Sequence, residues 1–116
     1  MKKVLIFLSI FSLLVANDKS DIENLINEHW ESWNSSKYKA YISTVHSAGT
    51  MNGDSNGSFW YIQQSTVAAW TEGQLPSNKF NFNPRYIEVD VLEKGKVAVA
   101  YYYLVGSYTI YGVEKS

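Results

Sequence analysis

Apolar and polar side chains alternate most clearly in the last third of the chain, from Arg85 to Tyr111. This stretch is rich in Val, Ile and Tyr, whose branched and aromatic side chains pack well on a pleated surface. Lys94 and Gly95 lie between two such runs, and glycine supplies the positive φ that a tight connection needs. The pattern predicts a long antiparallel hairpin in which Lys94 and Gly95 form the loop and Tyr86 faces Tyr103.

The two faces of this hairpin differ, because side chains two residues apart on a strand share a face. One face is apolar and is expected to meet helices: Ile87, Val89, Val91, Ala98, Ala100, Tyr102 and Leu104. The other is amphipathic: Tyr86, Glu88, Asp90, Leu92, Val97, Val99, Tyr101 and Tyr103. Paired carboxylates can divide acid and base roles, but this register turns Glu88 and Asp90 away from the helices. They are therefore interpreted as a solvated or interface-rim pair.

Helical spacing dominates the residues before the hairpin. Apolar side chains recur three and four residues apart after Ser20, whose spacing from Glu23 is that of a capping box, so a helix is predicted over Asp21–Ser35. Shorter helices are predicted at Lys37–Ser47 and Gln64–Glu72, the last with Val67 and Trp70 inward.

Loops and a short strand separate these helices from one another and from the hairpin. Thr50–Gly57 is rich in Gly, Asn and Ser and is predicted to be a loop, followed by a short strand at Ser58–Ile62. Gln74–Pro84 is a connector, and Gly106 marks a bulge or bend in the last strand. Helices on one face of an antiparallel sheet define an α+β domain.

Composition narrows the function classes. The chain has 116 residues, of which 46% are hydrophobic and 16% aromatic, so it holds one domain at most and is not a disordered chain. A net charge of −1 offers no electrostatic footprint for nucleic acid. The absence of cysteine rules out disulfides, thiolate metal sites and cysteine nucleophiles.

The N-terminus has the pattern of a secretory signal peptide. Lys2 and Lys3 precede an apolar run from Val4 to Val15, and Ala16 follows as a cleavage site. The run is shorter than the roughly 20 residues of a membrane-spanning helix. Residues 1–16 are therefore predicted to be a signal peptide, and residues 17–116 a single exported domain that is periplasmic or extracellular, with no stable membrane insertion after cleavage. The alternative interpretation is an uncleaved anchor or a buried strand.

The order of elements resembles the nuclear transport factor 2-like superfamily, and within it the small SnoaL-like branch of secreted bacterial proteins. The residues that carry this resemblance are the first helix ending Trp30-Glu-Ser-Trp33-Asn34, the short helix Tyr38-Lys-Ala-Tyr41-Ile42, and the strands Tyr86–Leu92 and Val97–Leu104.

The resemblance implies a cone-like fold in which a strongly curved antiparallel sheet wraps the N-terminal helices. It also implies a hydrophobic pocket inside the cone and a homodimer through the outer sheet face. The family usually ends with a further strand, and this sequence stops soon after Tyr111. Two interpretations stay open: the sequence is a fragment, or the sheet is one strand short.

Candidate pocket residues come from the aromatic and histidine positions. Trp33, Trp60 and Tyr102 are chosen as pocket-lining residues because Trp and Tyr combine large apolar area with a polar tip. His46 lies at the end of the second helix's inward face and is the candidate base or ligand-orienting donor. The alternative is core packing for the aromatic residues and a hydrogen-bonded boundary position for both His46 and His29.

Tyrosine and valine that helices do not cover suggest an interaction surface. The predicted homodimer interface is Tyr86, Val99, Tyr101 and Tyr103. No metal or cofactor site is predicted, because the calcium-like loop Asn52–Gly57 carries a single carboxylate and is better explained as a turn.

Three functions compete. The first is an exported small-ligand-binding or protein-association domain without catalysis, since no acid, base and nucleophile converge in the sequence. The second is a small SnoaL-like or ketosteroid-isomerase-like enzyme for an apolar, carbonyl-bearing substrate, with His46 as base and a Tyr or Trp as donor to the oxyanion. The third is an interaction module that uses only its outer sheet.

Overall fold

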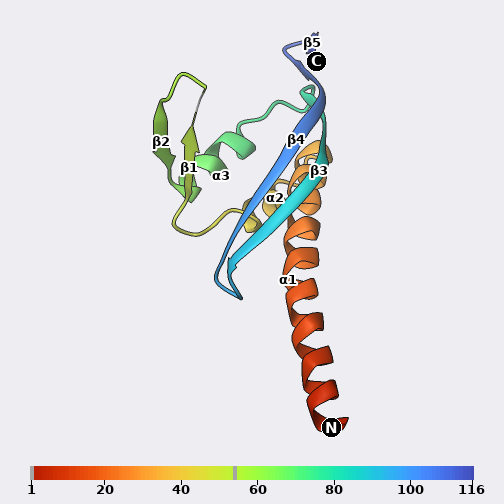
Figure 1. Cartoon of the computed structure of the whole chain (residues 1–116). Helices are drawn as coiled ribbons and strands as arrows, with labels where there is room; N and C mark the ends of the chain where they lie inside the picture. Colours follow the sequence, from red (N-terminus) through yellow and green to blue (C-terminus); the bar gives the residue numbers. More distant parts are fainter. Residues whose placement is uncertain (1, 54) are drawn as a thin grey trace.

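The computed structural model describes the backbone of residues 2–53 and 55–116, and the side chains of residues 18–53 and 55–116. The elements follow in the order α1 (Lys2–Asn34), α2 (Tyr38–Ser43), β1 (Thr50–Gly53), β2 (Phe59–Ile62), α3 (Gln64–Glu72), β3 (Lys79–Glu93), β4 (Val97–Ile110) and β5 (Val113–Lys115) (Figure 1). β1 and β2 pair with each other, and β3, β4 and β5 form a three-stranded antiparallel sheet. The predicted α+β class with N-terminal helices is confirmed.

Helix α1 begins earlier than the capping pattern predicted. Ser20 and Glu23 lie inside the helix, so the predicted start at Asp21 is wrong. The preceding residues contain neither Gly nor Pro, and a helix extends more easily than it starts anew. The predicted signal peptide, residues 1–16, lies outside the residues whose side chains the structure describes.

The middle of the chain differs from the prediction in two places. Helix α2 ends at Ser43 rather than at residue 47, and the predicted loop begins instead with strand β1, whose residues pair with β2 from Thr50 opposite Ile62 onwards. Pairing with β2 outweighs the weak strand propensity of Asn and Gly here. Helix α3 has the predicted bounds. Its Val67 is buried as expected, but Trp70 is 55% exposed and does not point inward.

The register of the long hairpin is right at its centre and wrong at both ends. The pairs from Glu88 opposite Tyr101 to Val91 opposite Ala98 are those that alternation predicts. Near the turn, Glu93 pairs with Val97, so the loop holds Lys96 as well as the two predicted residues, and the register shifts by one. Such a shift is a β-bulge, in which one strand carries an extra residue.

A second bulge lies between Arg85 and Glu88, where Tyr86 takes a positive φ of 57°. Arg85, not Tyr86, therefore faces Tyr103. The predicted connector before the hairpin is also wrong in part, because β3 already begins at Lys79 and continues through Pro84.

Gly106 allows the two long strands to approach closely. It pairs with Phe82 without any register shift, so the predicted bulge at this position is wrong. Its φ is 156°, and a Cβ atom here would lie 1.7 Å from the carbonyl oxygen of Asn81. The position therefore requires glycine, which has no Cβ.

Helix α1 is tied to the sheet near its C-terminal end. The Asn34 Nδ2 group donates to the Phe82 carbonyl oxygen at 2.8 Å, and the Phe82 N–H donates to Asn34 Oδ1 at 2.8 Å. The side chain thus satisfies both backbone groups of one residue of β3, as a neighbouring strand would. These two hydrogen bonds fix how α1 lies along β3.

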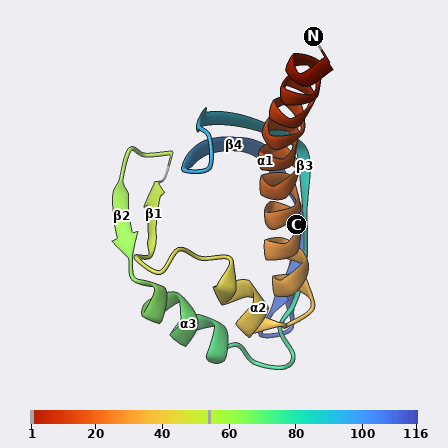
Figure 2. The ribbon, with the colours of Figure 1, turned by 90° about the horizontal axis from the view of Figure 1, so that it is seen from below.

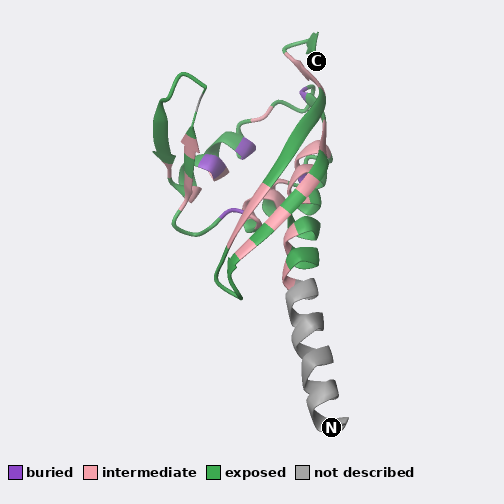
Figure 3. Cartoon of the chain, in the orientation of Figure 1, coloured by how far each residue is buried: buried purple, intermediate pink, exposed green. Residues whose placement is uncertain are grey.

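The hydrophobic core is small. Among the described side chains, Val45 and Val67 are the buried apolar residues, and Ser32, Thr71 and Asn78 the buried polar ones. Exposed residues dominate the β1–β2 hairpin and much of β4 (Figure 3). Seen from below, the β1–β2 hairpin stands apart from α1 and β3, and α2 and α3 lie between the two (Figure 2). Much apolar surface is therefore left for contacts with other molecules.

Candidate functional site

An aromatic cluster joins α1, α2 and the first half of β3. The Trp33 ring lies 4.9 Å from Tyr41 and 4.9 Å from Phe80, centroid to centroid, and 5.5 Å from Tyr38. Phe82 extends the cluster to Trp30 at 5.8 Å. These separations and tilted arrangements are those in which aromatic rings attract one another.

Polar groups of the aromatic residues gather at one side of this cluster. The Trp30 Nε1–H donates to the Tyr102 hydroxyl at 3.1 Å, which joins α1 to β4. Burial raises the pKa of Tyr41, and the neighbouring Tyr102 raises it further. The Tyr41 phenol is therefore neutral at pH 7. The Tyr102 oxygen already accepts a hydrogen bond, so its own O–H is available to donate to a ligand.

His29 stands against the same cluster. Its ring lies 4.3 Å from that of Tyr41 and 4.8 Å from that of Trp30. Its Nδ1 contacts Thr44 Oγ1 at 2.5 Å, while the Thr44 hydroxyl donates to the Tyr41 carbonyl oxygen at 2.6 Å. Because that hydroxyl proton is already used, Nδ1 must be the donor, and Nε2 carries the lone pair. Burial lowers the pKa of His29, which keeps the ring neutral at pH 7.

A pocket of about 360 Å³ lies between α1 and the inner side of the hairpin. Its apolar wall comes from Ile22, Val91, Ala98 and Ala100, among other residues. Asp18 lines the same pocket, and its Oδ2 atom is buried without a hydrogen-bond partner among the described residues. Asp21, Glu93 and Lys96 line it as well, so the pocket combines an apolar wall with charged side chains, and its volume is in the range of a small-molecule site.

The pocket and the polar side of the aromatic cluster share one wall. Ala98, Ala100 and Tyr102 alternate along β4 and so lie on the same face of the strand. The distance from the first to the last is roughly 13 Å at the usual rise of a strand. This inner face of β4, with the facing side of α1, forms the candidate site. It offers an apolar wall, a phenol donor at one end and a carboxylate at the other.

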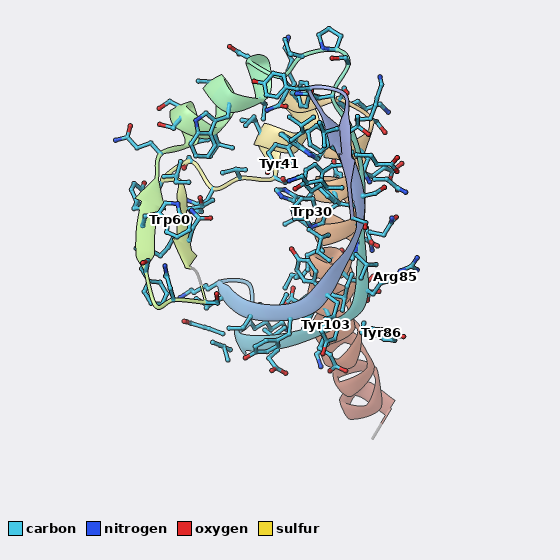
Figure 4. All side chains as sticks on the ribbon, turned by 90° about the horizontal axis from the view of Figure 1, so that it is seen from above. Trp30, Tyr41, Trp60, Arg85, Tyr86 and Tyr103 are labelled. Carbon is cyan, nitrogen blue, oxygen red and sulfur yellow. The ribbon has the colours of Figure 1, made fainter. Side chains whose placement is uncertain are left out.

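The four predicted pocket residues lie in different surroundings. Trp33 is in the aromatic cluster, and Tyr102 is at the polar end of the site. His46 is exposed, and its Nδ1 accepts a hydrogen bond from the Ala48 N–H within its own turn. Trp60 lies on β2, across from Trp30 and Tyr41 (Figure 4). A pocket shared by all four residues stays a prediction.

The sequence pattern did not single out the groups that accompany Tyr102. His29 was read as a boundary residue of α1, and Trp30 and Tyr41 as core residues. His29 and Trp30 belong to α1 and Tyr41 to α2, so their meeting with Tyr102 depends on the fold. The available signal was His29 immediately before Trp30, two polar ring systems at the margin of an apolar stripe.

Residues of the predicted homodimer interface are largely exposed. Tyr86, Tyr101 and Tyr103 are 83%, 60% and 70% exposed, and Val99 is half-buried. The rings of Tyr86 and Tyr103 meet edge to face at 6.3 Å, beside a groove that Glu23 of α1 also lines. Glu88 and Asp90 are exposed, as the register predicts.

Metal ligands do not cluster within the described part of the chain. Asp54, the one carboxylate of the calcium-like loop, lies outside the described residues. Across the same part of the chain, no helix has the length and apolar character needed to span a membrane.

No protein-family model, no curated protein and no solved structure matches this chain.

Proposed function

We propose that this protein is an exported domain of the nuclear transport factor 2-like type that binds a small apolar ligand bearing a carbonyl or hydroxyl group. The observation that carries the proposal is the inner face of β4, where a pocket lined by Ala98 and Ala100 lies on the same face of the strand as Tyr102. An apolar wall supplies most of the affinity of such a site, and a few fixed polar groups set the orientation of the ligand.

In this proposal the ligand lies along β4, with its apolar body against Ala98 and Ala100. Its oxygen accepts the proton of Tyr102, whose orientation is fixed by the Trp30 N–H. The carboxylate of Asp18, with its unpartnered oxygen, accepts from a hydroxyl or amine at the other end. A ligand with one acceptor at one end and one donor at the other would satisfy both groups.

Three further features of the proposal are predictions from the sequence, and each has one supporting observation. Export is supported by the two lysines and the apolar run at the start of the chain. The cone-like fold with a strongly curved sheet is supported by the two bulges in the hairpin, because bulges bend strands. A homodimer through the outer sheet face is supported by the exposure of Tyr86, Tyr101 and Tyr103.

A second function, an enzyme that moves a proton next to a carbonyl, is favoured by one observation. His29 is neutral, and the hydrogen bonds around Thr44 leave the Nε2 lone pair free to accept a proton. Tyr102 would then hold the developing oxyanion. In this alternative His29 takes the role of base that is predicted for His46 from the sequence.

The test is a titration with prodan, a fluorescent naphthalene that carries one ketone and emits at shorter wavelength in apolar surroundings. The wild-type protein is expected to bind it with a blue-shifted emission. Tyr102→Phe removes one hydrogen bond, so the dissociation constant is expected to rise about fivefold. Tyr101→Phe is the matched control, because Tyr101 lies on the opposite face of the same strand.

Equal affinity of both variants and the wild-type protein would refute the role of Tyr102. Absence of binding by the wild-type protein would count against the ligand-binding function. Deuterium uptake next to a ketone, faster with the wild-type protein than with His29→Gln, would favour the enzyme.

A further inference from the structure

One edge of strand β4 is open. β4 pairs with β3 along one edge, but on the other edge it pairs with β5 only from Tyr108 to Ile110. From Val97 to Ser107 this second edge has no strand partner within the part of the chain that the structure describes. An edge of this kind presents a row of N–H and C=O groups that another strand can pair with.

The open edge lacks the charged residues and the proline that protect many exposed edges. Proteins usually guard them with charged residues, proline or a covering segment. β4 contains no charged residue and no proline from Val97 to Ile110. β3, in the same hairpin, contains Pro84 and Glu88, and its outer edge is bonded at Phe82 to Asn34. The contrast between two paired strands indicates that the edge of β4 is suited to association.

The sequence of β4 is complementary to itself when two copies run antiparallel around Tyr101. On the outer face, Val97 then faces Val105, Val99 faces Tyr103, and Tyr101 faces its own copy. On the inner face, Ala98 faces Leu104 and Ala100 faces Tyr102. Pairs of aromatic and β-branched residues stabilise antiparallel strands, and small residues opposite large ones fit together. The pairing ends at Val105, before the part of the edge that β5 occupies.

Charge does not oppose this arrangement. The nearest like charges are Glu88 and Asp90 on β3, which is one strand away from the shared edge. Glu88 and its copy would be three strand spacings apart, roughly 14 Å. That exceeds the Debye length of about 8 Å at physiological salt, so the repulsion is screened. An uncharged strand also offers nothing to a partner that recognises charge.

We propose that two copies of this chain associate through the β4 edge, antiparallel around a twofold axis at Tyr101, and so form one continuous sheet. The contact runs along the backbone edge of β4, whereas the ligand site uses the inner face of this strand and the predicted outer-face contact uses its other face. The contact is isologous, with the same edge used by both copies, so association through it stops at the dimer.

The chain's lack of cysteine permits a direct test. In Tyr101→Cys the two new thiols face each other across the axis, at the Cα separation of about 4.5–5.5 Å of directly opposed residues. Disulfides accept this separation. With oxidised glutathione as oxidant, the variant is expected to form a disulfide-linked dimer nearly completely. Glu88→Cys is the matched control on the neighbouring strand, and it is expected to stay monomeric on a non-reducing gel.

A second variant tests the edge without cross-linking. Tyr101→Lys puts two ammonium groups opposite each other and is expected to raise the dimer dissociation constant at least about tenfold. The measurement is molar mass by light scattering over a dilution series of the wild-type protein and the variant. Tyr101 is exposed, so folding is expected to be kept, as circular dichroism can check.

A wild-type protein that stays monomeric at every concentration would overturn the proposal, because the β4 edge would then not pair with a second copy. Cross-linking of Glu88→Cys as efficient as that of Tyr101→Cys would also overturn it, since it indicates sheets packed face to face. A dimer that Tyr101→Lys does not weaken would place the contact elsewhere. None of these results depends on ligand binding.

Discussion

Replacement of Asn34 by alanine tests how α1 is held against the sheet. The change removes the two hydrogen bonds, each 2.8 Å long, between the Asn34 side chain and the backbone of Phe82. A hydrogen bond within a protein contributes about 0.5–1.5 kcal/mol to stability, so two of them amount to about 2 kcal/mol. Asn34 and Phe82 are half-buried, so water can replace only part of the two lost hydrogen bonds.

This loss is large enough to measure. For a domain of this size, 1 kcal/mol corresponds to a shift of about 4–8 °C in melting temperature, so a decrease of roughly 10 °C is expected. The assay is thermal unfolding followed by circular dichroism at neutral pH. A larger decrease is expected if the β3–β4 hairpin also loses its contact with the aromatic rings of Trp30 and Trp33, which lie on the same helix.

Asn27→Ala is the matched control on the same helix. Its Nδ2 group donates to the Glu23 carbonyl oxygen, one turn earlier, and the side chain is exposed. Alanine is also the better helix former, so a change of less than about 0.5 kcal/mol is expected. Equal melting temperatures for Asn34→Ala and Asn27→Ala would refute the conclusion that Asn34 holds the helix to the sheet.

Two further predictions concern pH and backbone packing. Burial lowers the pKa of His29 from 6.5, so below that pH the unfolded chain binds a proton more readily than the folded chain does. The free energy of unfolding should therefore be highest above pH 6.5 and should decrease as the pH falls below it. The melting temperature of His29→Gln should depend less on pH than that of the wild-type protein. His46→Gln, which changes the exposed histidine, should keep the wild-type pH dependence. The same pH dependence of melting temperature in both variants would contradict the burial of His29. Gly106→Ala should destabilise the protein by more than about 1 kcal/mol, because its Cβ would meet the Asn81 carbonyl oxygen. Gly73→Ala, with an ordinary φ of −79°, is the control, and similar unfolding midpoints in urea for the two variants would contradict the close approach of β3 and β4.

The centre of the hairpin could be predicted from the sequence because alternation allows only one register there. Glu88 to Val91 alternate between acidic and aliphatic residues, and a slip by one residue would turn the acidic side chains towards α1. The ends could not be predicted. A positive φ at Tyr86 is unfavourable for a bulky residue, and nothing in the local sequence signals it.

Strand alternation also predicted one part of the candidate site. Tyr102 followed from strand alternation, which places it on the inner face. Its hydrogen bond from Trp30 spans 72 positions in the chain and depends on how α1 crosses the sheet. The hydrogen bonds of Asn34 help to set that crossing. From the sequence alone, an Asn near the end of a helix predicts only that the helix ends there and does not reveal a contact with a strand. The role of His29 could not be predicted from its own helix, because Thr44, whose hydroxyl determines the tautomer of His29, follows α2 in the chain.

The most direct test of the proposed site is to fill it. Ala100→Phe places a ring on the inner wall of the pocket between α1 and β4, and Val99→Phe places the same ring on the other face of the strand. After melting curves confirm that both variants are folded, their affinities for prodan are compared with that of the wild-type protein. Loss of binding in Ala100→Phe with retention in Val99→Phe is the result the proposed site predicts. Undiminished binding by folded Ala100→Phe would contradict it.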